Sequence, residues 1–385
     1  MGEVIYLIKK GFAAVFLAVC MTVLSTVPAF AVDDALVTAP AAVLMEASTG
    51  KILYEKNAHE KRPCASITKV MTLLLVFEAI DGGKLSLDDI ITTSAHAASM
   101  GGSDIWLEEG ETMTADDMIK ATVVASANDA AVALAEHISG SEDAFVDRMN
   151  ARAKELGMND TTFKNCNGLD EEGHLTSAAD VAIMSRELIK HKKIFDYTSI
   201  WLDYLRGGET QIVNTNKLLK TYNGITGLKT GTTDDAGCCM SATAERDGMS
   251  LIAVVLGCDN GKQRFADGAA LLDYGFANYS VEEIKTPAEL PKSLEVKGGM
   301  ADSVALSCEI DDSVVVEKAS ADEPEFTINL PESMDAPVEE HERLGEVVCK
   351  IGETERSYDI ISAETVEKTS FGKAFGYLMA AMVKG

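Results

Sequence analysis

Apolar residues recur along the chain with two different periods, and these divide it into a helical middle between two regions of strands. Two short apolar runs within residues 41–54 flank the turn residues 47–50, which predicts a strand, a turn and a strand. From about Ser66 the apolar residues follow one helix face until Gly82 and Gly83, and glycine is typical of a helix end. The same spacing predicts further helices over residues 114–124, 129–138, 141–156 and 177–191.

Strand patterns return after the helical block. Residues 224–233 form one candidate strand, and Asp247-Gly248 separates two apolar runs as the turn of a β-hairpin. A closing helix is predicted over residues 263–276. This order of elements predicts an α+β domain over residues 32–278, in which one mixed sheet is flanked by helices and joined to the helical block.

Residues 279–365 have a different composition. Apolar and polar residues alternate over 304–310, 326–330 and 347–351, and proline, glycine and aspartate interrupt the alternation. Period-two runs with turn residues between them predict a small all-β domain.

The final segment, residues 366–385, returns to helical spacing. One helix face carries the large apolar side chains Phe371, Phe375, Leu378, Met379 and Met382. Lysines surround this face, and Glu367 is the only acidic residue of the segment. An amphipathic helix of this kind predicts attachment to a membrane surface. The alternative is a helix that packs on its own domain.

The N-terminal segment has the features of an export signal. Lys9 and Lys10 precede an apolar run from Gly11 to Leu24, and Ala29-Phe30-Ala31 matches a cleavage site. We therefore expect a signal peptide over residues 1–31 and an exported protein. An uncleaved anchor helix is the alternative interpretation, although the run is short for a membrane span.

Charge and cysteine content exclude several classes of protein. The chain has 34 Lys and Arg against 61 Asp and Glu, a net charge of −27, and an acidic chain of this kind does not bind nucleic acid through a basic face.

Seven cysteines follow residue 31: Cys64, Cys166, Cys238, Cys239, Cys258, Cys308 and Cys349. They contain no C-x-x-C pair and no histidine lies at ligand spacing, so we expect buried apolar side chains, no metal and no other cofactor.

Three short motifs carry the candidate chemistry. They are Ser66-Ile67-Thr68-Lys69, Ser126-Ala127-Asn128 and Lys229-Thr230-Gly231. Each motif alone occurs by chance in many chains, but the three in this order, each in a fitting local context, are a strong signal.

The first motif predicts a nucleophile and its base. A serine hydroxyl needs a base within hydrogen-bond reach, and Lys69 lies three residues from Ser66 on the same helix face. Lysine accepts a proton only when neutral, and burial, a helix N-terminus and a second cation such as Lys229 lower its pKa. The alternatives are that Ser66 is a plain helix N-cap and that Lys69 is a solvated lysine.

The other two motifs predict substrate contacts. Ser126 can relay a proton to the leaving amine, and Asn128 can bind the substrate amide or position Lys69. Lys229 and Thr230 offer a positive charge and a hydroxyl to a terminal carboxylate. Gly231 lets a substrate backbone approach the strand edge, and the backbone N–H groups of Ser66 and Thr232 are candidates for an oxyanion hole.

The chain resembles the low-molecular-mass penicillin-binding proteins that are serine-type D-alanyl-D-alanine carboxypeptidases. The resemblance rests on Arg62–Lys69, Ser126–Ala130 and Thr226–Gly231, and it extends to the β domain and the tail. It implies a transpeptidase-like catalytic fold and removal of the terminal D-alanine from peptidoglycan stem pentapeptides through a Ser66 acyl-enzyme. It also implies acylation by penicillins and action at the extracytoplasmic face of the cytoplasmic membrane or in the cell wall. Two positions depart from the family pattern: Cys64 is unusual beside the nucleophile, and Thr232 stands where some members have histidine.

Four other functions stay open at this point. A β-lactamase shares the motifs, but it needs neither the β domain nor the tail. A D,D-endopeptidase that cuts crosslinks has motifs that sequence does not distinguish. A non-enzymatic penicillin sensor would be expected to tolerate loss of Ser66 or Lys69, yet both are intact. A cysteine hydrolase would use Cys64, but no Cys-His arrangement stands out.

Overall fold

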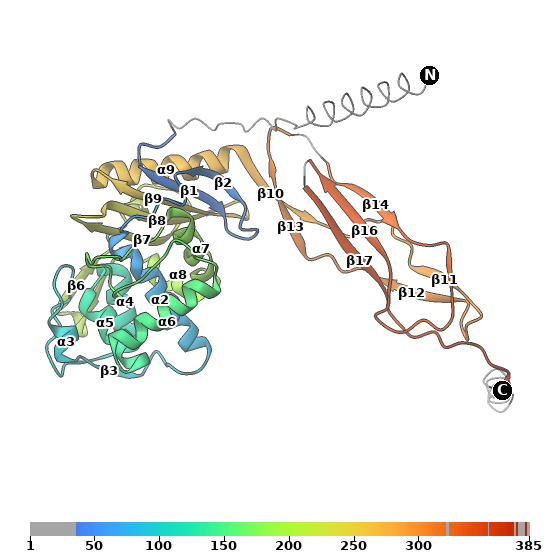
Figure 1. Cartoon of the computed structure of the whole chain (residues 1–385), viewed down its shortest axis with the longest axis horizontal. Helices are drawn as coiled ribbons and strands as arrows, with labels where there is room; N and C mark the ends of the chain where they lie inside the picture. The colour runs from blue at the N-terminus through green and yellow to red at the C-terminus, as the bar shows by residue number, and fades with distance from the viewer. Residues whose placement is uncertain (1–35, 321–322, 353, 373–374, 376–381, 383–385) are drawn as a thin grey trace, which may run out of the picture. The chain divides into compact units, whose positions relative to one another are not determined.

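The computed structural model describes residues 36–320, 323–352, 354–372, 375 and 382 (Figure 1). The first domain is built on a five-stranded sheet in the order β2-β1-β9-β8-β7. Its strands are β1 (Ala41–Glu46), β2 (Ile52–Lys56), β7 (Ile225–Thr233), β8 (Gly237–Arg246) and β9 (Met249–Cys258). Every neighbouring pair is antiparallel, which corrects the expected mixed sheet. The reason is that β7, β8 and β9 are consecutive and joined by tight turns, and such turns reverse the chain.

Helices cover the sheet and form the block that the sequence predicts. They are α2 (Lys69–Asp81), α3 (Ala95–Ala98), α4 (Ala115–Lys120), α5 (Asn128–Ser139), α6 (Glu142–Glu155), α7 (Ala178–Leu188), α8 (Phe195–Thr198) and α9 (Gly261–Asn278). Ser241 of β8 hydrogen-bonds Ser185 of α7, whereas its neighbour Met240 packs on Gly268 of α9. Adjacent strand residues point to opposite faces, so α7 and α9 lie on opposite sides of the sheet (Figure 1).

The helix starts and the hairpin turn follow the predicted local chemistry. Thr114 accepts a hydrogen bond from the backbone N–H of Asp117 at the start of α4, and Ser141 accepts one from Ala144 at the start of α6. Asp247 and Gly248 both have positive φ angles, 51° and 77°, between β8 and β9, as a two-residue hairpin turn requires. The predicted starts of these two helices and the predicted hairpin turn are confirmed.

The predicted start of the first helix is wrong. Ser66 lies in a short 3₁₀ turn, η1 (Ala65–Thr68), and α2 begins only at Lys69. No side-chain hydrogen bond caps either helix start, which rules out the N-cap interpretation of Ser66. The helix that follows is almost wholly buried, because it packs between the other helices rather than on the surface.

Two small two-stranded sheets were not predicted from the sequence. They are β3 (Ile90–Thr92) with β4 (Thr112–Thr114), and β5 (Leu202–Leu205) with β6 (Thr210–Val213). Each strand has only three or four residues, which is too short for a period-two pattern to be distinguished from loop.

The second domain consists of strands, as predicted. They are β10 (Tyr279–Ile284), β11 (Ser293–Lys297), β12 (Ser303–Ser307), β13 (Asp312–Glu317), β14 (Glu325–Asn329), β15 (Ser333–Asp335), β16 (Arg343–Ile351) and β17 (Thr354–Ser362). Six of them form a sheet in the order β14-β16-β17-β12-β11-β15, and β10 pairs with β13.

Val366 is buried and pairs with Val338, and Thr369 donates its N–H to Gly298. The expected boundary at residue 366 therefore falls inside a strand-like contact, and the domain extends to Thr369.

The predicted terminal segments lie mostly outside the described residues. This holds for the signal peptide over residues 1–31 and for much of the amphipathic segment 366–385, including Leu378 and Met379. Of that apolar face, Phe371, Phe375 and Met382 are described, and all three are exposed. Within the described part of the chain, no helix is long and apolar enough to cross a membrane. The seven cysteines from Cys64 to Cys349 are free and buried, as expected.

Candidate active site

The η1 turn that carries Ser66 is held between two close backbone contacts. Ala65 adopts a left-handed conformation with φ 51°, which directs the chain sharply into the turn. A Cβ atom on Gly168 would lie 2.0 Å from the carbonyl oxygen of Ala65, and one on Gly231 would lie 2.9 Å from the nitrogen of Ser66. Two glycines from distant parts of the chain thus let the Ser66 turn sit against both β7 and the 165–169 turn.

Lys69 places its amine beside the Ser66 hydroxyl. Its Nζ lies 3.0 Å from Ser66 Oγ, 2.5 Å from Asn128 Oδ1 and 2.6 Å from the carbonyl oxygen of Asn167. The side chain is fully buried, and desolvation lowers the pKa of Lys69 to about 7. The alternative of a solvated Lys69 is therefore ruled out.

These three contacts orient the lone pair of the neutral amine. The Asn128 side-chain oxygen and the Asn167 carbonyl only accept hydrogen bonds, so each takes one hydrogen of the NH₂ group. The third position around the nitrogen, which holds the lone pair, then faces Ser66 Oγ. This geometry suits a base that takes the serine proton.

The second motif lies between two helical segments, as predicted. Ser126 follows a π-helical turn (Ala121–Ala125) and has a left-handed φ of 62°. Its Oγ accepts a hydrogen bond of 2.7 Å from Lys229 Nζ. Asn128, the first residue of α5, bonds Lys69 through Oδ1 and the Gly101 carbonyl through Nδ2. The second motif thus contacts both buried lysines, Ser126 through Lys229 and Asn128 through Lys69.

The third motif lies on β7, which is an edge strand of the sheet, as predicted. Lys229 is buried, and its pKa is lowered by desolvation and then by the positive charges of Lys69 and Arg264. Thr230 Oγ1 donates to Thr215 Oγ1 at 2.7 Å. Gly231 serves a purpose that the sequence did not indicate, since the missing side chain makes room for the Ser66 turn.

Arg264, from the first turn of α9, is a site residue that the sequence reasoning missed. Its Nη1 donates to the Gly231 carbonyl at 2.8 Å and to Thr232 Oγ1 at 3.0 Å. It is buried, while its Nε has no hydrogen-bond partner among the described residues. The sequence showed only one arginine at the start of a predicted helix, so no signal separated it from a solvated one.

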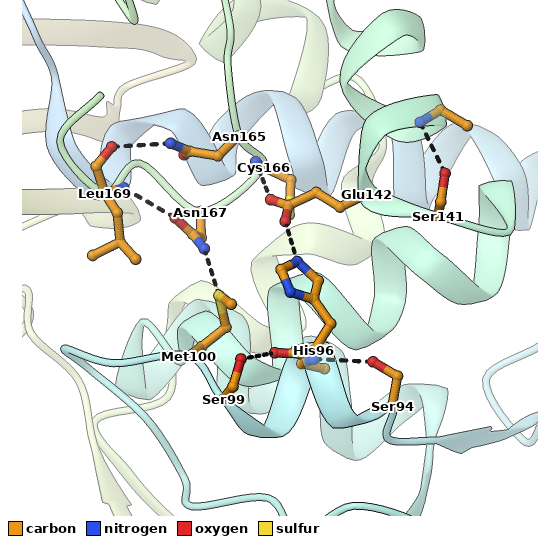
Figure 2. A network of polar contacts seen from close by, with 12 residues as sticks. Ser94, His96, Ser99, Met100, Ser141, Glu142, Asn165, Cys166, Asn167 and Leu169 are labelled. Atoms are coloured by element: carbon orange, nitrogen blue, oxygen red, sulfur yellow. Dashed lines mark hydrogen bonds and ion pairs between the residues drawn. The ribbon is translucent and has the colours of Figure 1, made fainter. Parts of the chain in front are cut away.

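Asn167 was also missed, because it acts through its backbone carbonyl. Figure 2 shows the turn that presents it. Asn167 Oδ1 accepts the N–H of Leu169 at 2.9 Å, and Nδ2 donates to Met100 Sδ at 3.4 Å. Asn165 Oδ1 accepts the N–H of Gly168 at 2.8 Å. A main-chain acceptor has no residue signature, so only the fold reveals it.

Cys64 is part of a buried hydrogen-bond chain behind the nucleophile. Its Sγ lies 3.4 Å from Thr68 Oγ1, which lies 2.8 Å from His174 Nε2. His174 Nδ1 accepts the backbone N–H of Lys164, so the neutral ring carries its proton on Nε2 and donates to Thr68. Burial raises the pKa of Cys64 to about 11 and lowers that of His174 to about 4. A donor histidine and a neutral, buried thiol argue against Cys64 as the nucleophile.

Comparisons with known proteins show which family the chain is similar to. Residues 28–260 match the family described as D-alanyl-D-alanine carboxypeptidase, and residues 282–368 match the C-terminal domain of penicillin-binding protein 5. The chain is 42% identical to D-alanyl-D-alanine carboxypeptidase DacF of Bacillus subtilis, over 86% of this chain and 87% of that protein. It is 35% identical to DacD of Escherichia coli, over 79% and 80% of the two chains.

Solved structures give the same result for the fold. Penicillin-binding protein 5 from Haemophilus influenzae superposes with a TM-score of 0.75 at 29% identity, over 86% of this chain and 98% of that one. Penicillin-binding protein D2 from Listeria monocytogenes, in its ampicillin-bound form, has a TM-score of 0.56 at 35% identity. That match covers 63% of this chain and all of the other. The predicted α+β fold class with a following β domain is confirmed.

Proposed function

The chain belongs to the family of serine-type D-alanyl-D-alanine carboxypeptidases, and from this premise we propose that Ser66 is its nucleophile and Lys69 its general base. The observation that carries the proposal is the arrangement around Lys69. Its amine has a pKa of about 7, lies 3.0 Å from Ser66 Oγ and has its hydrogens directed elsewhere by two acceptors. The other members of the site take roles that follow from their contacts.

In acylation, Ser66 Oγ attacks the carbonyl carbon of the penultimate D-alanine while its proton passes to Lys69 Nζ. The carbonyl oxygen becomes an oxyanion, which the backbone N–H groups of Ser66 and Thr232 stabilise. The contact between Gly231 and the nitrogen of Ser66 supports this assignment, because it brings the strand that carries Thr232 against the Ser66 turn.

The leaving amine needs a proton when the peptide bond breaks. Ser126 Oγ donates its own proton to the D-alanine nitrogen and takes one from Lys229 Nζ, to which it is already hydrogen-bonded. The amine leaves as D-alanine, and the peptide stays on Ser66 as an ester. Lys69 then releases to solvent the proton that it took from Ser66, and Lys229 regains one from solvent. A water molecule attacks the ester while neutral Lys69 takes its proton, and Lys69 returns that proton to Ser66 Oγ as the ester bond breaks, which frees the shortened peptide and restores the serine.

The terminal carboxylate of the substrate identifies the bond to be cut. Lys229 and Arg264 supply positive charge at the β7 edge, and the hydroxyls of Thr230 and Thr232 supply donors. Asn128 keeps its Nδ2 on Gly101 and its Oδ1 on Lys69, so it positions the base rather than binding the substrate amide.

The natural substrate is the peptidoglycan stem pentapeptide that ends in D-Ala-D-Ala, and β-lactams are covalent inhibitors. The ampicillin-bound relative, which is 35% identical and matches 63% of this chain, supports the second part. Export through residues 1–31 and attachment of residues 366–385 to the membrane surface place the enzyme at the outer face of the cytoplasmic membrane. Similarity to penicillin-binding proteins over 86% of the chain supports this location.

The test is release of D-alanine from a peptide ending in D-Ala-D-Ala, with Ser66→Ala and Lys69→Ala as comparisons. We expect turnover by the wild type and a loss of at least ~10³-fold in either variant, the scale seen when a nucleophile or its base is removed. Thermal unfolding should show that Ser66→Ala stays folded, because Ser66 caps no helix. Activity of Ser66→Ala within tenfold of wild type contradicts the assignment.

A further inference from the structure

A largely buried carboxylate outside the three motifs holds the residue that precedes Asn167. Glu142, the first residue of α6, accepts the backbone N–H of Cys166 on Oε1 at 2.9 Å. Its other oxygen, Oε2, lies 2.8 Å from His96 Nε2 of α3, and Figure 2 shows both contacts. The Glu142 side chain is 14% exposed, whereas surface glutamates are normally solvated.

The backbone of Cys166 is fixed from both sides. Glu142 holds its N–H, and Thr72 Oγ1 of α2 donates to its carbonyl oxygen at 2.5 Å. The next carbonyl along the chain is that of Asn167, which accepts from Lys69 Nζ at 2.6 Å. These anchors hold the peptide that joins Cys166 to Asn167. The next peptide, which carries the Asn167 carbonyl, starts from this fixed end and is held at its other end by the hydrogen bond of 2.8 Å from Gly168 N–H to Asn165 Oδ1.

We propose that Glu142 is a positioning residue for catalysis: by anchoring Cys166, it aims the Asn167 carbonyl at Lys69 and so directs the lone pair of Lys69 toward Ser66. This inference rests on the proposed function, because it assigns Glu142 a role through the proposed general base. His96 supports Glu142 by holding its second oxygen, and Thr72 supports the same turn from the opposite side.

If Glu142 positions Lys69 in this way, its loss should slow the acylation of Ser66 and should leave substrate binding unchanged. The groups proposed to bind the substrate carboxylate lie on β7 and α9, and none of them contacts Glu142, Cys166 or Thr72 in the described structure. A rotated Asn167 carbonyl leaves one hydrogen of the amine free to turn toward Ser66, which removes the lone pair from the attack geometry. The rate of serine acylation therefore falls while binding of the substrate does not.

The experiment compares Glu142→Ala with the conservative Glu142→Gln in the full-length protein. Glutamine keeps an oxygen for the Cys166 N–H, whereas alanine removes it. We expect kcat for a D-Ala-D-Ala peptide to fall ~10–100-fold in Glu142→Ala with KM within threefold of wild type, the scale for a misplaced catalytic group. Glu142→Gln should stay within about threefold of wild type in kcat, on the same argument. Asp143→Asn, an exposed neighbour in the same helical turn, is the matched control and should be unchanged.

Thr72→Val provides a second route to the same carbonyl if Glu142→Ala does not fold. It removes the other anchor of Cys166 with a side chain of the same shape, and we expect a fall in kcat with an unchanged KM. Rates are normalised to the fraction of enzyme that a radiolabelled penicillin acylates at completion. The proposal is overturned if Glu142→Ala and Thr72→Val retain wild-type kcat, or if Glu142→Gln is as slow as Glu142→Ala. Absence of D-alanine release by the wild type would contradict the proposed function instead.

Discussion

Lys229 Nζ donates to Ser126 Oγ at 2.7 Å, which joins the second and third motifs across the site from the pair formed by Ser66 and Lys69. Both lysines are buried, and the positive charge of Lys69 adds to desolvation in lowering the pKa of Lys229. Two ammonium groups in one buried site repel each other, so protonating one favours the neutral form of the other. The site therefore keeps a neutral lysine available at moderate pH.

This arrangement predicts the acid limb of the pH–rate profile. The folded pKa of Lys69 is about 7, and only its neutral form accepts the Ser66 proton. Activity should therefore rise as pH increases through about 7 and be lost below it. The measurement is kcat/KM for a D-Ala-D-Ala peptide against pH, since this ratio reports the free enzyme. A profile that is flat between pH 5 and 9, on the scale over which side chains titrate, would contradict Lys69 as the base.

A charge near Lys69 tests the assignment of that limb. The negative charge of Asp104 raises the pKa of Lys69, so Asp104→Asn should move the acid limb to lower pH. Asp88→Asn, at an exposed position beyond α2, is the control and should leave the limb in place. A shift of the same size in both variants would mean that the limb belongs to another group.

Gly168 lies so close to the turn that carries Ser66 that Gly168→Ala should lower both the stability of the protein and its rate of acylation. A Cβ atom there would lie 2.0 Å from the carbonyl oxygen of Ala65, so Gly168→Ala must displace the turn that carries Ser66. Gly173→Ala is the matched control, because Gly173 has nearly the same φ (81° against 88°) and its nearest neighbour is the flexible Lys164 side chain at 3.4 Å. Both variants carry the strain of a left-handed alanine, ~1–2 kcal/mol.

We expect Gly168→Ala to be less stable than Gly173→Ala by a further ~1–3 kcal/mol, the usual cost of overpacking. It should also acylate more slowly with penicillin, whereas Gly173→Ala should acylate at the wild-type rate. Chemical denaturation and the rate of penicilloyl ester formation measure the two effects. Equal stability and equal acylation of the two variants would show that the Ser66 turn tolerates displacement.

The sequence predicted the side chains of this site better than its backbone. Ser66, Lys69, Ser126, Asn128 and Lys229 are all found together, because residue type and spacing carry their chemistry. The sequence predicts an α-helix from Ser66, because the apolar spacing that follows is helical. The structure has a 3₁₀ turn there, which uses the same residue types as the first turn of an α-helix and so has no separate sequence signature.

Contacts between distant segments were beyond the reach of pattern reasoning. The sequence shows that Gly168 and Gly231 lack side chains, but only the fold shows why. A Cβ atom on either residue would lie 2.9 Å or less from a backbone atom of the Ser66 turn. Arg264 reaches the β7 edge because α9 lies along one face of the sheet (Figure 1). Such relationships depend on tertiary packing, which no local spacing encodes.

Removal of the C-terminal tail should release the protein from membranes. The cut must follow Thr369 rather than precede Val366. Val366 is buried and Thr369 bonds the β domain, so the segment to remove is residues 370–385. The exposed Phe371, Phe375 and Met382 would insert into the interface. Liposome flotation should show the 32–385 protein bound and the 32–369 protein free, with equal D-alanine release from a soluble peptide. Equal flotation of both forms would contradict the anchor.

The last prediction separates the carboxypeptidase from a β-lactamase, because both acylate a serine and differ in how fast water removes the acyl group. Ser66 should open the ring of a penicillin, and the opened leaving group stays tethered near Lys69. Fast hydrolysis then needs a second base to aim water at the ester, the role of a glutamate in class A β-lactamases. Among the described residues no carboxylate hydrogen-bonds Lys69, and Glu171 and Glu172 lie exposed in the turn that precedes His174.

A peptide substrate differs from penicillin in that its D-alanine diffuses away and leaves space for water. We therefore expect a long-lived penicilloyl ester on Ser66 together with sustained release of D-alanine from a D-Ala-D-Ala peptide. Intact-mass spectrometry should show one penicillin added per chain, and Ser66→Ala should show none. Rapid steady-state hydrolysis of penicillin, without a trapped ester and without D-alanine release, would instead identify a β-lactamase, and it would require a water-activating group that the geometry around Lys69 does not provide.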